Sequence, residues 1–193
     1  MKTFRLALVV LASVLFCVGN AVGQEETESD AAVDLKDFEK TLAKAKDGDA
    51  DAMANLGYMY DIGQGVTQDY TEAVKWYRKA AELGHANAMY NLGVMHANGE
   101  GVIEDDKEAV KWFRKAAELG DAGAMTNLGF MYANGEGVIE DDVEAYAWFN
   151  VAAAKGMKMA AEKRDRVKKT MTPEQIAEGQ KRSREIMKTI TEE

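Results

Sequence analysis

Cysteine is almost absent from this chain, and the only one, Cys17, lies in an apolar run near the N-terminus. That run, residues 6–18, follows Lys2 and Arg5 and precedes small residues, which is the pattern of a secretory signal peptide. It is shorter than the roughly 20 apolar residues of a membrane span. We therefore expect cleavage after residues 1–23, a periplasmic or secreted protein with no stable membrane span, and a mature chain without a thiol for a disulfide, metal site or nucleophile.

Histidine and serine, which supply many catalytic side chains, are also scarce. The histidines are His85 and His96, and the only serines after residue 23 are Ser29 and Ser183, near the two ends. The chain has no nucleophile-elbow string, phosphate-binding loop or zinc-binding histidine pair. We predict that the protein is not an enzyme and has no catalytic residue and no cofactor. An enzyme acting on cell-wall material, or a small-molecule binder, is the alternative.

Positive charge is in the minority. The formal net charge is −9, and loss of Lys2 and Arg5 with the signal peptide takes it to −11. Such an acidic chain is a poor nucleic-acid binder, so we expect no nucleic-acid partner. Residues 155–193 are the exception, with 11 Lys and Arg against 7 Asp and Glu. These C-terminal helices could make a weak contact with an anionic surface or an acidic partner, although a solvated helical face is the alternative.

Repetition is the dominant positive feature of the sequence. One pattern occurs three times at a spacing of 36 residues, starting at Gly48, Gly84 and Gly120, and Gly156 begins an incomplete fourth copy. Each copy holds two segments whose apolar residues recur at i, i+3, i+4 and i+7, as in amphipathic helices. One such pair of helices cannot bury its own apolar face, so the copies must stack. The sequence predicts an all-α fold, a right-handed α-α solenoid of stacked helix-turn-helix repeats.

The repeat register also sets the expected organisation of the chain. Residues 34–46 have the register of a lone second helix, and residues 172–175 have the pattern of a helix start. About nine helices are expected. The predicted segments are a signal peptide (1–23), an acidic disordered linker (24–33), an N-terminal capping helix (34–47), three repeats (48–83, 84–119 and 120–155) and C-terminal capping helices (156–193).

Glycine and aromatic residues recur at fixed places in each copy. Glycines just past each helix suit left-handed caps. Gly57, Gly93 and Gly129 lie within the first helix, where glycine costs about 1 kcal/mol relative to alanine. We expect each to allow close approach of the aromatic pair of the second helix. That pair (Trp76 and Tyr77 in the first copy) is predicted to be core.

The two histidines have structural explanations in the repeat alignment. His85 aligns with Asp49 and Asp121 at the start of a first helix, so we expect a helix-capping role. His96 aligns with tyrosines and is expected to be packed. The carboxylate-rich loops 98–106 and 134–142 lack the spacing of a calcium-binding EF-hand loop, so no metal site is predicted.

The expected binding surface lies on the first helix of each pair, because in stacked helical hairpins one helix of each pair lines the concave surface. Asn55, Asn91 and Asn127 are identical across the copies, whereas two nearby positions vary. The asparagines could bind an extended protein or peptide, and an inter-repeat hydrogen bond is their structural alternative. The candidate partner-binding residues are Asn55, Tyr58, Tyr90, Asn91, Asn127 and Phe130.

The repeated motifs closely resemble the Sel1-like repeat, a relative of the tetratricopeptide repeat. They read Ala-Met-x-Asn-Leu-Gly-x-Met, then Gly-x-Gly-Val, then Glu-Ala-x-x-Trp-Phe/Tyr. The resemblance implies an adaptor that binds a protein or peptide partner, with a structural envelope component as another alternative. One branch, the cysteine-rich Helicobacter proteins, has been linked to beta-lactam binding, but the cysteines of its repeats are missing here. A beta-lactam-like ligand is therefore kept only as an alternative.

Overall fold

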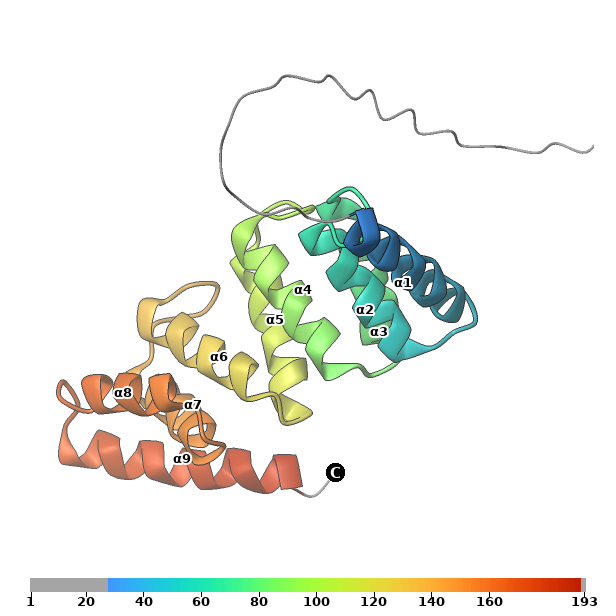
Figure 1. Cartoon of the computed structure of the whole chain (residues 1–193). Coiled ribbons are helices and arrows are strands. Elements are labelled where there is room, and N and C mark those ends of the chain that lie inside the picture. The colour runs from blue at the N-terminus through green and yellow to red at the C-terminus, as the bar shows by residue number, and fades with distance from the viewer. Residues whose placement is uncertain (1–27, 192–193) are drawn as a thin grey trace, which may run out of the picture.

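The computed structural model describes residues 28–191, which form helices and short connections without a strand (Figure 1). The predicted signal peptide (1–23) and residues 24–27 of the predicted linker lie outside the described residues. The all-α repeat architecture is confirmed. The helices are α1 (Glu28–Lys46), α2 (Ala50–Ile62), α3 (Tyr70–Glu82), α4 (Ala86–Asn98), α5 (Asp106–Glu118), α6 (Ala122–Asn134), α7 (Asp142–Ala154), α8 (Lys158–Val167) and α9 (Pro173–Thr191).

Each repeat pairs a first helix with a second helix through the glycine inside the first. A Cβ atom on Gly57 would lie 2.7 Å from Cδ1 of Tyr77, and one on Gly93 would lie 2.6 Å from Cδ1 of Phe113. Gly129 meets Phe149 in the same way. The aromatic rings thus rest on bare backbone, as the sequence predicts, and Tyr77 is fully buried.

The helix ends follow the predicted capping pattern. Asp69 precedes α3, and its side chain accepts a hydrogen bond from the backbone N–H of Glu72 at 3.0 Å. His85 caps α4, because its Nδ1 accepts from the backbone N–H of Ala88 at 3.2 Å. Gly63, after α2, has a left-handed φ of 75°. The expected capping role of His85 is confirmed.

A second set of glycines, which the sequence reading did not single out, fixes the stacking of one repeat on the next. A Cβ atom on Gly101 would collide with the carbonyl of Tyr70 at the start of α3, and one on Gly65 would collide with the carbonyl of Asp34 in α1. Asp34 and Tyr70 are 36 residues apart, so α1 occupies the place of a second helix, as predicted. However, α1 begins at Glu28, inside the predicted linker, where its acidic residues favour a helix N-terminus.

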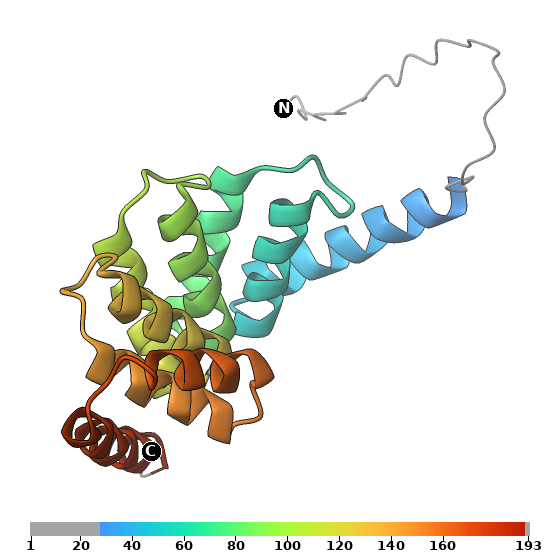
Figure 2. The ribbon, with the colours of Figure 1, turned by 90° about the vertical axis from the view of Figure 1, so that its left-hand side faces the viewer.

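The C-terminal end departs from the repeat. The last helix, α9, packs mainly on α7, whereas a regular repeat would pair it with α8 (Figures 1 and 2). A Cβ atom on Gly179 of α9 would lie 2.7 Å from Cδ1 of Tyr146 in α7. Arg182 of α9 donates to Glu144 of α7 at 2.6 Å. The predicted start of this helix is confirmed by reciprocal hydrogen bonds between Thr172 and Gln175, of 2.8 and 3.3 Å.

The sequence of α7 explains this docking. In α5 the solvent-facing positions hold Lys111 and Lys115, but the equivalent residues of α7 are Ala147 and Val151, both fully buried. In α8, by contrast, Asp165 takes the place of the helix-pairing glycine. An apolar helix face lowers its free energy by burial, and a charged one does not. α9 therefore covers α7 and leaves α8 without a second helix.

Within the described residues, no helix combines the length and apolar character needed to cross a bilayer.

Candidate functional site

The first helices form one continuous face. α2, α4 and α6 contact each other in sequence along the solenoid. Fully buried leucines anchor each helix, and the residue before each leucine is one of the repeated asparagines. Residues three positions apart on a helix lie on the same side. We call this surface the asparagine face, and it comprises Asn55, Tyr58, Asn91, Val94, Asn127, Phe130 and, at the same register of α8, Lys163 and Arg166.

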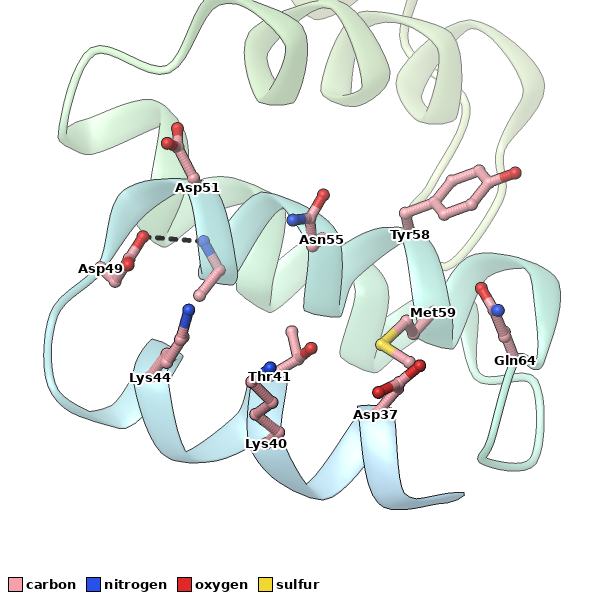
Figure 3. Close-up of a pocket in the computed structure, with 11 residues that line it drawn as sticks. Asp37, Lys40, Thr41, Lys44, Asp49, Asp51, Asn55, Tyr58, Met59 and Gln64 are labelled. Carbon is pink, nitrogen blue, oxygen red and sulfur yellow. Dashed lines mark hydrogen bonds between the residues drawn. The ribbon is translucent and has the colours of Figure 1, made fainter. Parts of the chain in front are cut away.

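At its N-terminal end the asparagine face opens into a cleft of about 490 Å³ between α1 and α2. Asn55 and Tyr58 project from α2, and Lys40, Thr41 and Lys44 line the cleft from α1 (Figure 3). Tyr58 is 50% exposed, whereas Tyr77 of the same repeat is fully buried. The predicted residues Asn55 and Tyr58 are therefore accessible and belong to one cleft.

The polar wall of this cleft was missed in the sequence. α1 is a second helix without a first helix before it among the described residues. In the next repeat, Tyr77 and Ala80 fill the equivalent positions and are fully buried, whereas α1 has Thr41 and Lys44 there. A polar outer face is what the terminal element of a solenoid needs for solubility. Register comparison with α3 was the signal that could have found these residues.

In the middle of the face, Asn91 is more enclosed. Its Nδ2 donates to Oδ1 of Asn87, one turn earlier, at 3.2 Å. Hydrogen bonding to Asn91 also lowers the pKa of the Tyr77 hydroxyl, but burial and the Asp61 carboxylate have larger effects and raise it. Asn91 is thus partnered within α4 and also lies beside Tyr77 of the preceding repeat.

Tyr90 does not lie free on the surface. Its ring is 5.9 Å from that of Phe113, centroid to centroid, and it packs against Gly123 of the next repeat. The equivalent residues Ala54 and Thr126 are buried, so this variable position faces neighbouring helices. Of the two variable positions, the one held by Tyr90 therefore packs toward the next repeat, because it lies one residue before the asparagine, and the one held by Tyr58 is exposed.

A second cleft, of about 210 Å³, brings Asn127 and Phe130 together between α4 and α6. The ring of Phe130 packs edge-on against Phe149 at 5.2 Å between centroids. Nζ of Lys163, from α8, lies 4.9 Å from the centre of the Phe130 ring. The complete lining is Val94, Ala97, Asn98, Phe113, Asn127, Phe130, Met131 and Glu136.

The two ends of the asparagine face differ in charge. Near α2, the pKa of the Asp61 carboxyl is raised by burial and by the Glu100 carboxylate, although a 3.4 Å hydrogen bond from the Tyr77 hydroxyl opposes this. At the other end, Lys163 and Arg166 form no ion pair with any described residue. The face therefore carries charges of both signs at its α2 end, where Lys40 and Lys44 line the first cleft, and cations without an ion pair at α8.

The side chains of the asparagine face are suited to non-covalent recognition. The face combines amide donors and acceptors, two clefts with an aromatic wall, and separated charges. His96 is not part of it, because it is buried with both ring nitrogens unpaired, which agrees with its expected packing role. In residues 28–191, no three His, Cys, Asp or Glu side chains are grouped so that they could hold a metal ion.

Comparisons with known proteins place the chain in a family. The Sel1 repeat family model matches residues 50–85, 86–121 and 122–157. A crystal structure of a protective antigen of uropathogenic Escherichia coli, with an SLR fold, is 35% identical over 79% of this chain and 33% of its own, with a TM-score of 0.75. A Sel1 repeat protein from Oxalobacter formigenes is 40% identical over 65% of this chain and 52% of its own, with a TM-score of 0.62.

The chain thus spans about a third of the length of the Escherichia coli antigen and about half of the length of the Oxalobacter protein. The cysteine-rich protein B of Helicobacter pylori shares the fold at 24% identity, over 66% of this chain and 95% of its own, with a TM-score of 0.55. A comparison with curated proteins finds no match. Because the three matched repeats cover more than half of the sequence, the chain belongs to the Sel1 repeat family.

Proposed function

We propose that this protein is an exported scaffold that binds a protein or peptide partner along the asparagine face. Sel1 repeats commonly serve as scaffolds for protein interaction. The observation that carries the proposal is the placement of three identical asparagines on one face, with an open cleft at two of them. Asn55 lies beside the exposed ring of Tyr58, and Asn127 lies beside Phe130.

This arrangement suits an extended polypeptide. Amide side chains both donate and accept hydrogen bonds, so a row of them can pair with successive backbone groups of a bound segment. Tyrosine and phenylalanine in clefts are typical of the few residues that dominate binding energy. Tyr58 and Phe130 would supply these anchors at the two ends of the row.

Affinity capture from envelope extract tests the binding proposal. The bait is the protein, compared with a variant carrying Asn55→Ala, Tyr58→Ala and Asn127→Ala. A matched control carries three substitutions to alanine at exposed charged positions of the second helices: Lys75→Ala, Lys111→Ala and Lys115→Ala. We expect a stoichiometric partner with the wild type and the control, and its loss with the first variant at unchanged thermal stability. Equal capture by both variants would contradict the proposal.

The same extract separates the alternative functions. Hydrolysis of peptidoglycan, or saturable binding of a beta-lactam, without a protein partner would favour an enzyme or small-molecule binder. An envelope defect on gene deletion without any discrete partner would favour a structural component.

Export is a separate part of the proposal and rests on the pattern of residues 1–23. Cell fractionation followed by mass spectrometry of the N-terminal peptide tests it directly. We expect a mature chain that begins close to Gln24 in the periplasm or the medium. An intact N-terminus in the cytoplasm would contradict it.

A further inference from the structure

The basic end of the asparagine face lies on α8, the last of the first helices among the described residues. In each repeat the second helix packs on the glycine side of the first helix, so the asparagine register stays accessible. Arg166 is exposed and Lys163 is half-buried against Phe130. Both occupy the register positions that Asn127 and Phe130 hold in the preceding repeat, 36 residues earlier. Two cations therefore lie on the binding side of α8, next to the second cleft.

We infer that the basic end of the asparagine face binds a carboxylate side chain of the partner, next to an apolar side chain held in the second cleft. The inference rests on the proposed function and adds the chemical class of the partner segment. Val94, Ala97 and Met131 give the second cleft an apolar wall. Lys163 and Arg166 form no ion pair with a described residue and supply the complementary charge.

The spacing of the helices sets the spacing of the two ligand groups. Packed helices lie about 8–10 Å apart. A polyproline II segment rises about 3.1 Å per residue and repeats every 3 residues, so side chains i and i+3 share one side about 9 Å apart. An apolar residue in the second cleft and an acidic residue at α8 are therefore separated by about three positions.

The neighbouring charges favour an acidic ligand at this end of the face. Arg164, which adjoins Lys163 on α8, is already paired with Asp165 at 2.8 Å and donates to Asn150 at 3.2 Å. At the opposite end, charges of both signs line the first cleft, with Lys40 and Lys44 beside Asp37, Asp49 and Asp51. A carboxylate there would meet acidic residues as well as cations, whereas Lys163 and Arg166 form no ion pair with a described residue.

A protein segment fits this surface better than an anionic membrane. Lys163 lies against the ring of Phe130 in the row of first helices. A flat bilayer reaches protruding residues more readily than residues on the inner side of a solenoid. Glu162 and Asp165 are also exposed on α8 and would be repelled by anionic lipid.

Selection from random 12-residue peptides displayed on phage tests the inference. One target is the wild-type protein and another carries Lys163→Glu and Arg166→Glu. A control with the same change of charge carries Lys107→Glu and Lys181→Glu, which are exposed on α5 and α9. Circular dichroism verifies that all three proteins melt alike.

We expect the wild type and the control to enrich peptides with Asp or Glu about three positions from an apolar residue. A synthetic peptide from this set should bind the Lys163 and Arg166 variant roughly tenfold or more weakly, because charge-assisted hydrogen bonds become repulsions. The variant itself should enrich basic residues in place of acidic ones.

Three results would overturn the inference, and they are distinguishable. If the enriched peptides depend on Tyr58 but carry no acidic residue, the proposed function stands and the carboxylate site fails. If no peptide is enriched by any target, both fail. If vesicles of anionic phosphatidylglycerol bind the wild type but not the charge-reversed variant, and the peptides are not acidic, the basic end recognises lipid instead.

Discussion

At the scale of single residues, the contacts of glycine explain most of the repeat. The sequence alone predicted that Gly57, Gly93 and Gly129 approach aromatic rings, because glycine within a helix is unfavourable unless something replaces its side chain. The structure agrees, with rings at 2.6–2.7 Å from the place of a Cβ atom. The role of Gly65, Gly101 and Gly137 could not be predicted, since they contact residues of the preceding repeat and nothing local marks that contact.

Gly93 provides a test of this contact. Gly93→Leu should lower the free energy of unfolding by about 3 kcal/mol, because the new side chain would overlap Phe113 in a closed core. The control is Asn87→Leu, at an exposed position of the same helix. Urea unfolding of both variants checks the difference, and equal stability of the two would contradict the close approach.

His96 gives a pH-dependent prediction. Burial lowers the pKa of its imidazole, and Arg78 adds to this, whereas Glu108 and Asp105 oppose it. The folded protein thus binds the proton less tightly than the unfolded chain does. Stability should therefore fall as the pH decreases through the ordinary histidine pKa, about 6.5, toward the lower value of the folded state.

A tyrosine at this position should remove the acid sensitivity. In the next repeat, Tyr132 accepts a hydrogen bond from Arg114 at 2.7 Å, and Arg78 is the equivalent arginine for position 96. We expect His96→Tyr to raise stability more at pH 5.5 than at pH 7.5, as measured by urea unfolding. An identical gain at both pH values would show that His96 does not titrate as its burial implies.

At the scale of helices, the boundaries and caps were predictable and the partner of α9 was not. Capping depends on residues three positions apart, such as Thr172 and Gln175, which the sequence displays directly. The docking of α9 depends on α7, where Tyr146, Ala147 and Val151 replace the residues of earlier repeats. These replacements are visible in the sequence. They indicate the docking of α9 only when it is known that α9 does not pack on α8.

Gly179 tests the docking of α9. Gly179→Leu should separate α9 from α7, because a Cβ atom alone would lie 2.7 Å from the Tyr146 ring. Ala177→Leu, on the exposed side of the same helix, is the control. Hydrogen exchange followed by mass spectrometry should show faster amide exchange in both α9 and α7. Unchanged protection of α7 would contradict the assignment of α9 as its cover.

At the scale of the whole molecule, the 36-residue period predicted the solenoid and the shared face of its first helices, but it did not predict the two clefts. Asn55, Tyr58, Asn127 and Phe130 were predicted as candidates and line the two clefts. The polar wall of the first cleft belongs to α1, whose sequence lacks the repeat motif, so only a comparison of its register with that of α3 could reveal it. Tyr90 was predicted as a surface residue because helical periodicity does not distinguish a position facing solvent from one facing the next repeat.

Site-specific photo-crosslinking in the native cell tests the central claim, that a partner binds along the asparagine face. A photoreactive amino acid replaces Tyr58, Val94 or Phe130 on that face, or Lys75, Lys111 or Lys181 on the second helices and α9. We predict that each of the first three positions gives a crosslinked product of the same mass, because all three capture the same partner. The other positions should give no crosslinked product. The same crosslinks from the second helices, with none from the asparagine face, would contradict the account.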